Sequence, residues 1–366
     1  MFLLAIFLLS TSCADNSGEG DTSSQQGGLP PSSREDSASC EPESYNKEYE
    51  IQITSFFPSA TTNYLVPPAL CGDEILITDA PSWLSSEKKN AVSIQLDTLE
   101  ETDLGFFSPE VQADENYYYW MEAFDRASFG IKRTSKRDGT TQLIYPFDLS
   151  RQIIPRLSYG DGYLAWIEME HIDEYSARWH YYGFNCETEE VFPICSTNYE
   201  YGPYDPVPIY NSHITCTQRE GGAYVINCID LKTPSVVKRS VKTGFEPTRI
   251  FYDGNQLVWT NQNGIFMNYL DGTTERILTG RSRNVWIYAS RHLLYTQNFQ
   301  IFVYDLKTKE QIFTTKPADD SWPEKTYNGW SIIDTVKGRV VLAGRRSGDH
   351  EDCYSIEVLT FLEKND

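Results

Sequence analysis

A short alternating apolar segment recurs along most of this chain, and it restricts the possible folds more than any other feature. Each segment reads as a strand, and the next one follows after 36 to 50 residues. The last residues of the seven segments are Ile77, Trp120, Trp166, Cys216, Trp259, Tyr295 and Leu342. Strand-rich repeats of this period are typical of propeller blades with four strands each. The sequence therefore predicts an all-β fold, a β-propeller of seven four-stranded blades. Six or eight blades are the alternatives, because the segment ending at Cys216 fits the pattern least well.

Polar turns separate these expected strands. Gly, Asp or Asn residues precede most of the segments, as at residues 72–73 and 253–255, and are typical of tight hairpin turns. A second strand pair follows each segment and turns at a polar step, as at residues 230–233, 271–273 and 305–308. An Asp side chain can accept hydrogen bonds from backbone amides in such a turn, which explains its placement without a functional role.

The two ends of the repeat are predicted to meet. Residues 49–53 form an alternating strand that precedes the first repeat, and the final repeat has room for one more long strand, at residues 354–362. We expect residues 49–53 to complete the last blade and close the ring. Closure removes the sheet edges that would otherwise invite aggregation.

One blade carries a recognisable pattern. Residues 264–273 (GIFMNYLDGT), followed by Arg276-Ile277-Leu278, resemble the repeat of YWTD-type and TolB-like propellers. The likeness extends more loosely over residues 45–362. It implies a propeller that serves mainly as a binding scaffold. The Pro-x-Trp-Ser-Pro-Asp-Gly repeat of TolB itself is absent.

The first residues indicate export. Phe2–Leu9 is an apolar run of eight residues, too short to span a bilayer and of the right length for the core of a signal peptide. Small residues at 10–12 lead to Cys13, and the whole resembles a bacterial lipoprotein signal. The resemblance implies that residues 1–12 are removed and that Cys13 carries acyl chains such as palmitate. An ordinary secretory peptide cleaved near the same place is the alternative, and both imply export.

A tether follows the expected anchor. Residues 14–41 are mostly Ser, Gly, Asp, Glu, Gln and Pro, with Leu29 as the one large apolar side chain. Such a segment cannot bury enough surface to offset its ordering entropy, so residues 13–41 are predicted to form a disordered, lipidated tether. Residues 42–366 would then be the propeller, held at the cell envelope or, without the lipid, secreted.

The net charge and the absence of known catalytic motifs argue against several classes of function. The net charge is −21 and the pI about 4.6, which argues against nucleic-acid binding and against adsorption to anionic lipids, so membrane contact is expected through the lipid alone. Serine-hydrolase, sialidase, zinc-helix and phosphate-loop motifs are absent. We expect no catalytic residues, no cofactor and no metal, although an enzymatic role stays open. Acidic clusters at residues 171–174 and 349–352 could ligate a cation, but such loops are usually solvated.

Apart from Cys13, the expected anchor, the chain has an odd number of cysteines. In an oxidising compartment, Cys186 with Cys195 and Cys216 with Cys228 are candidate disulfides, because each pair lies on one predicted hairpin. Hairpin spacing does not guarantee the Cα separation that a disulfide needs, so free thiols are the alternative.

Long loops on one face supply the candidate binding residues. The loops expected at residues 79–90, 121–129, 168–178, 196–209, 316–329 and 343–353 should surround the mouth of the channel. The candidate ligand-binding residues, of types enriched at binding hot spots, are Trp83, Phe124, Asp125, Tyr175, Tyr201, Tyr204, Trp322, Tyr327, Trp330 and Arg345. These aromatics could instead pack under their own loops. The favoured function is a non-enzymatic envelope scaffold that docks a protein or peptide, and the alternative is a glycan-binding or glycan-processing propeller.

Overall fold

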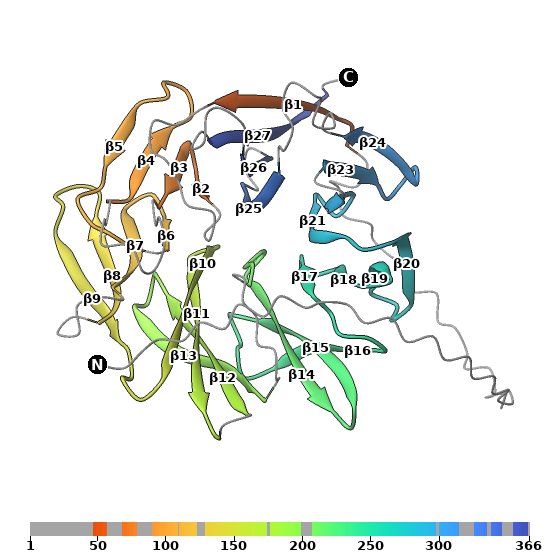
Figure 1. Cartoon of the computed structure of the whole chain (residues 1–366), viewed down its shortest axis with the longest axis horizontal. Helices are drawn as coiled ribbons and strands as arrows, with labels where there is room; N and C mark the ends of the chain where they lie inside the picture. Colours follow the sequence, from red (N-terminus) through yellow and green to blue (C-terminus); the bar gives the residue numbers. More distant parts are fainter. Residues whose placement is uncertain are drawn as a thin grey trace, which may run out of the picture. The chain divides into compact units, whose positions relative to one another are not determined.

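Alternating apolar and polar residues give this chain strands throughout its ordered body. The computed structural model describes residues 47–56, 68–78, 90–108, 110–122, 129–173, 176–198, 207–297, 300–314, 326–334, 338–345 and 354–364. These residues form the strands β1 to β27 and no helix, so no helix in this part of the chain could cross a membrane. All of them belong to the unit Pro42–Asp366. Their strands are grouped into seven antiparallel sheets around a ring (Figure 1).

The first three blades follow chain order from the innermost strand outward. Blade 1 comprises β2 (Ala69–Cys71), β3 (Glu74–Ile77), β4 (Val92–Gln95) and β5 (Glu101–Asp103). Blade 2 comprises β6 (Val111–Ala113), β7 (Tyr117–Glu122), β8 (Gly130–Ser135) and β9 (Thr141–Pro146). Blade 3 comprises β10 (Gln152–Gly160), β11 (Tyr163–His171), β12 (Ala177–Asn185) and β13 (Glu190–Thr197).

The remaining blades continue around the ring. Blade 4 comprises β14 (His213–Glu220), β15 (Ala223–Asp230) and β16 (Val237–Thr243). Blade 5 comprises β17 (Arg249–Tyr252), β18 (Leu257–Asn261), β19 (Gly264–Asn268) and β20 (Thr274–Thr279). Blade 6 comprises β21 (Arg283–Tyr288), β22 (His292–Gln297), β23 (Gln300–Asp305) and β24 (Glu310–Thr314). Blade 7 comprises β25 (Thr326–Asp334), β26 (Arg339–Arg345), β27 (Tyr354–Glu363) and β1 (Tyr49–Phe56).

The predicted fold class and blade number are confirmed. Blade 4, which contains the weakly patterned Cys216, is a true sheet of the ring, so seven is the count. Its described part has three strands, and residues 199–206, which come before β14, lie outside the described residues. The other six blades have four strands each.

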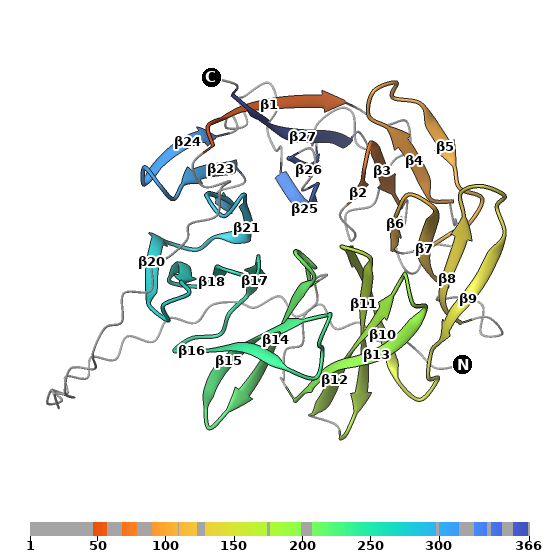
Figure 2. The same cartoon turned by 180° about the vertical axis from the view of Figure 1, so that it is seen from behind.

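The N-terminal strand closes the ring as the sequence predicts. β1 is the outermost strand of blade 7 and pairs antiparallel with β27 along its whole length, from Tyr49 opposite Glu363 to Phe56 opposite Ile356. Figure 2 shows the same closure from behind, with β1 outside β27. Residues far apart along the chain therefore complete one sheet.

The hydrophobic core lies between neighbouring blades. One cluster joins Leu76 of blade 1 to Trp120 of blade 2, and another joins Ile75 of blade 1 to Val358 of blade 7. Similar clusters fill the other interfaces of the described blades. The four aromatic residues that end apolar segments are all buried, namely Trp120, Trp166, Trp259 and Tyr295. Because each blade buries both faces against its neighbours, no blade can be stable alone.

Aspartates cap the turns, as predicted. The carboxylate of Asp271 accepts a hydrogen bond from the amide of Thr273 at 2.8 Å, and that of Asp305 accepts one from Lys307 at 2.8 Å. In the β17–β18 turn, Asp253 accepts hydrogen bonds from the amides of Asn255 and Gln256. These carboxylates therefore have local structural partners.

The connections at the two ends of the strands differ in length. At one end, here called the turn rim, successive strands are joined by short intervals, of which the longest is 231–236. At the other end, the loop rim, strand ends are separated by longer intervals in blades 1, 2 and 7, at 78–91, 123–129 and 346–353, whereas the β14–β15, β18–β19 and β22–β23 intervals have two residues each. Antiparallel strands send alternate connections to opposite ends, so the longer intervals belong to one side of the ring.

Candidate functional site

A buried ion pair lies at the loop rim between blades 2 and 3. Arg151 precedes β10, and its Nη1 donates to Glu168 Oε2 on β11 at 3.1 Å and to the hydroxyl of Tyr182 on β12 at 2.6 Å. The Glu168 side chain is 0 % exposed and also accepts from the Trp166 indole N–H at 3.3 Å. A buried carboxylate is tolerated only when it is paired and hydrogen-bonded, and here both conditions are met.

Aromatic rings pack around this ion pair. The Tyr145 ring lies 4.9 Å from that of Trp166 and 5.8 Å from that of Tyr182, measured between ring centroids. Burial raises the pKa of Tyr145, and the nearby Glu168 charge raises it further, so the phenol stays protonated. These side chains give the loop rim a rigid base. The name blade 2–3 cluster is used below for these residues and for three more that are described next. Its members are Tyr145, Arg151, Trp166, Glu168 and Tyr182, together with Glu170, His180 and Ser196.

A carboxylate–imidazole–hydroxyl chain extends the cluster to the surface. His180 Nε2 lies 3.0 Å from Glu170 Oε2, and His180 Nδ1 lies 2.9 Å from Ser196 Oγ. The hydrogen bond from His180 lowers the pKa of Glu170. Hydrolases activate a serine through such a chain, but they also need an oxyanion hole and a substrate cavity. His180 and Ser196 are directly paired across β12 and β13, so cross-strand pairing explains their contact.

The cluster also brings charged groups to the surface. Glu170 and Arg178 are both partly exposed, and their charged groups lie 3.9 Å apart. His171 ends β11 beside them and contacts Gln152 at 3.2 Å. Acidic, basic and hydrogen-bonding groups thus share one surface above a fixed base, which suits recognition of a polar or peptide ligand.

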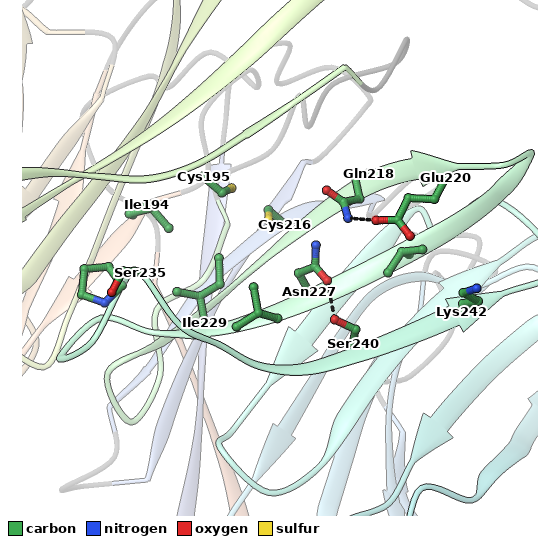
Figure 3. A pocket seen from close by; sticks show the side chains of 13 residues that line it. Ile194, Cys195, Cys216, Gln218, Glu220, Asn227, Ile229, Ser235, Ser240 and Lys242 are labelled. Carbon is green, nitrogen blue, oxygen red and sulfur yellow. Dashed lines mark hydrogen bonds between the residues drawn. The ribbon is translucent and has the colours of Figure 1, made fainter.

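A pocket of about 420 Å³ lies on the far side of blade 3, against blade 4 (Figure 3). Its floor is the face of β14–β16 that carries Cys216, Asn227 and Ser240, and Ser240 donates to Asn227 Oδ1 at 2.7 Å. Apolar residues and the charged Glu220 and Lys242 also line it. Its volume is in the range of small-molecule sites. Of the expected ligand-binding residues that the structure describes, Tyr327, Trp330 and Arg345, none is among the residues that line this pocket.

Most predicted site residues fall outside the described part of the chain. This holds for Cys13, Trp83, Phe124, Asp125, Tyr175, Tyr201, Tyr204 and Trp322. Their roles therefore stay predictions. The positions of the other three are described by their backbone.

Tyr327 and Trp330 lie in β25, the innermost strand of blade 7, and Arg345 is the last residue of β26. The expected loop 316–329 is therefore wrong at its end, because β25 already begins at Thr326. β25 pairs with β26 over nearly its whole length, and this pairing takes these residues into the sheet.

The two hairpin disulfides considered from the sequence are wrong. Cys186, Cys195, Cys216 and Cys228 are all free. Cys216 is opposite Asn227 in the β14–β15 register, so Cys228 faces the other side of the sheet. Cys186 lies in the β12–β13 turn, whereas Cys195 is opposite Tyr181, well along the hairpin. Among the described residues, no group of three or more potential ligand side chains could hold a metal ion.

The fold and these sites define the class: the chain is a seven-bladed β-propeller. No family model matches it, and no curated protein matches its sequence. Solved structures do match. An oligogalacturonate lyase from Vibrio parahaemolyticus is similar with a TM-score of 0.55 and 12 % identity, over 86 % of this chain and 98 % of the lyase.

Two further solved structures show weaker similarity. A puromycin-hydrolyzing peptidase from Mycobacterium tuberculosis is similar with a TM-score of 0.50 and 10 % identity, over 79 % of this chain and 51 % of the peptidase. TolB from Acinetobacter baumannii matches with a TM-score of 0.39 and 11 % identity, over 75 % of this chain and 77 % of TolB. At such identities the likeness concerns the fold alone.

Proposed function

We propose that this protein is a non-enzymatic binding scaffold that docks a protein or peptide partner on its loop rim. The observation that carries the proposal is that the longest intervals between strands, such as 78–91 and 346–353, all lie at the loop rim. Long connections on a rigid scaffold are where binding residues concentrate. The blade 2–3 cluster adds a fixed polar base to the same rim, with Glu170 and Arg178 partly exposed above it.

The location of the scaffold is part of the proposal. The apolar run Phe2–Leu9 and Cys13 support export and lipid anchoring at the cell envelope, and residues 13–41 have the composition of a tether. Such a tether would let the propeller reach partners above the membrane surface. Replacing Cys13 with Ser should release the protein from membranes, as measured by fractionation and by mass spectrometry of the N-terminal peptide. Unchanged membrane association without acyl chains would contradict lipid anchoring but leave docking intact.

A glycan ligand is the second reading. The Vibrio lyase, by its name, acts on oligogalacturonate, but its 12 % identity supports the fold only. A polyanionic sugar would meet a chain of net charge −21, so a neutral glycan is the more favourable ligand of this class. The ring of Trp166 is buried and cannot stack on a sugar, and Tyr145 and Tyr182 are only partly exposed, so the cluster offers no open aromatic face to a sugar ring.

Site-specific photo-crosslinking in cells tests the docking face. A photoreactive residue replaces Ile172, which is 50 % exposed between β11 and β12 at the loop rim. The matched control replaces Leu270, which is 70 % exposed in the β19–β20 turn at the turn rim. We expect a defined protein adduct at position 172 and none at 270. Equal adducts at both positions, or none at 172 alongside binding on a glycan array, would overturn protein docking on this rim.

A further inference from the structure

Two thiols from neighbouring blades meet at the pocket between blades 3 and 4. Cys195 lies on β13, the outermost strand of blade 3, and Cys216 lies on β14 of blade 4. Both line the pocket, and their thiols are within hydrogen-bonding reach of each other. Figure 3 shows the side chains of Cys195 and Cys216 next to each other among the residues that line the pocket.

The surrounding packing holds the two thiols in place. Cys216 belongs to the hydrophobic cluster between blades 3 and 4, and Cys195 packs against the same cluster. Next to them, the hydroxyl of Thr197 donates to the carbonyl oxygen of Thr217 at 2.7 Å, which fixes β13 against β14. The pair is therefore part of a defined interface between blades.

The other described cysteines lie in different surroundings. Cys186 packs against the hydrophobic core cluster between blades 2 and 3, and Cys71 against the one between blades 1 and 2. Cys228 belongs to the hydrophobic core cluster between blades 4 and 5. Cys195 and Cys216 are thus the one pair of the five described cysteines that shares a cluster.

We propose that Cys195 and Cys216 form a redox pair that closes to a disulfide between blades 3 and 4 when the protein meets an oxidising low-molecular-weight disulfide. One cysteine, as its thiolate, attacks a sulfur of the reagent, which breaks the reagent's S–S bond and releases one thiolate. The second cysteine then attacks the mixed disulfide and releases the other thiolate. The two protons lost from the cysteines end on the two released thiols, so the reagent is reduced and the protein is oxidised by two electrons.

The pocket gives the reagent a path to the pair. Cys195 is partly exposed and Cys216 is buried, so Cys195 makes the first attack on the reagent and Cys216 then attacks the mixed disulfide. The hydrogen bond to Cys216 and burial both raise the pKa of the Cys195 thiol. Exchange should therefore be slow at neutral pH and faster as the pH rises.

Peptide mapping of the full chain tests the pair directly. The reduced protein is equilibrated with mixtures of oxidised and reduced glutathione, free thiols are alkylated, and the digest is analysed by mass spectrometry. We expect a cross-linked peptide joining residues 195 and 216, and a melting temperature about 5 °C above that of the reduced protein. Because the readout is on the unaltered protein, it does not depend on a variant that folds.

Variants then assign the cross-link. Cys195→Ser and Cys216→Ser should each abolish both the cross-linked peptide and the rise in melting temperature, whereas Cys186→Ser should keep both. Glutathione trapped on Cys195 without a 195–216 cross-link, or Cys195 cross-linked mainly to another cysteine, would overturn the proposal.

Discussion

The guanidinium of Arg291 should hold the segment before the closing strand β1 against blade 6. Replacing Arg291 therefore tests quantitatively how much these contacts stabilise the ring. Arg291 lies in the β21–β22 turn of blade 6, with its side chain 2 % exposed. It binds Asp305 at 2.6 Å, Glu48 at 3.1 Å and the carbonyl oxygen of Lys47 at 2.5 Å. Two of these partners come directly before β1, so one side chain joins blade 6 to the segment that leads into the closing strand.

The expected loss follows from burial. The Asp305 side chain is 3 % exposed, so Arg291→Met leaves a buried carboxylate without its main partner. Breaking a buried ion pair in this way costs about 3–5 kcal/mol. For a domain of this size, that is a fall of about 4–8 °C in melting temperature. The control is Lys309→Met, whose ion pair with Glu275 spans 3.6 Å between side chains that are 68 % and 47 % exposed. Its loss should be below about 1 kcal/mol.

The pH dependence provides an independent check. Burial alone would raise the pKa of Asp305, but hydrogen bonds from Arg291 and the turn amides outweigh it and hold the pKa below the ordinary 3.8. The stability from this lowered pKa is present above 3.8 and is lost as the pH falls through the folded-state value. The difference between wild type and Arg291→Met, measured by urea unfolding, should therefore be full at neutral pH and shrink below 3.8. A loss no larger than that of Lys309→Met, or one independent of acid, would refute the role of this ion pair.

Three further outcomes are expected. Glu168→Ala should destabilise the protein by about 1–3 kcal/mol in chemical unfolding, because it leaves the buried Trp166 indole N–H and the Arg151 guanidinium without their acceptor; a loss under about 0.5 kcal/mol would count against these contacts. Gly264→Ala should cost at least about 2 kcal/mol, since φ is +148° and a Cβ would lie 2.0 Å from the Leu278 carbonyl oxygen; near-wild-type stability would contradict this geometry. Burial lowers the pKa of His292 from 6.5 to about 4, so stability should fall as the pH drops from 6.5 toward 4. His292→Phe should flatten that part of the profile, and an unchanged slope would exclude this residue as its source.

The repeat made the architecture predictable. The number of strand segments at propeller spacing predicts the number of blades. The additional strand at residues 49–53 is then available to complete the last blade and close the ring. The segment that ends at Cys216 fits the repeat pattern least well, because a cysteine stands where the other segments have an aromatic or aliphatic residue. The cysteine is nevertheless buried there, since a thiol packs as a small apolar group.

The polar sites were harder to predict because their members come from different strands and blades. Arg151 reaches Glu168 only once β10 and β11 have paired, and sequence spacing does not give that register. One signal was available: Glu168 occupies an inward position two residues after Trp166 in a buried strand. A charged residue at such a position indicates a buried partner. The Cys195–Cys216 contact had no such signal, because it crosses from one blade to the next.

The closure of the ring by β1 also decides when the fold can be completed. Lys47 and Glu363, which form an ion pair beside the β1–β27 sheet, are 316 residues apart along the chain. During synthesis β1 must wait, with its backbone unpaired, until nearly all the blades have emerged. Contacts of such separation slow folding, and the waiting strand edge can pair with other chains. A polypeptide cut before β27 would keep that edge open permanently, so it should associate with other chains more readily than the complete propeller does.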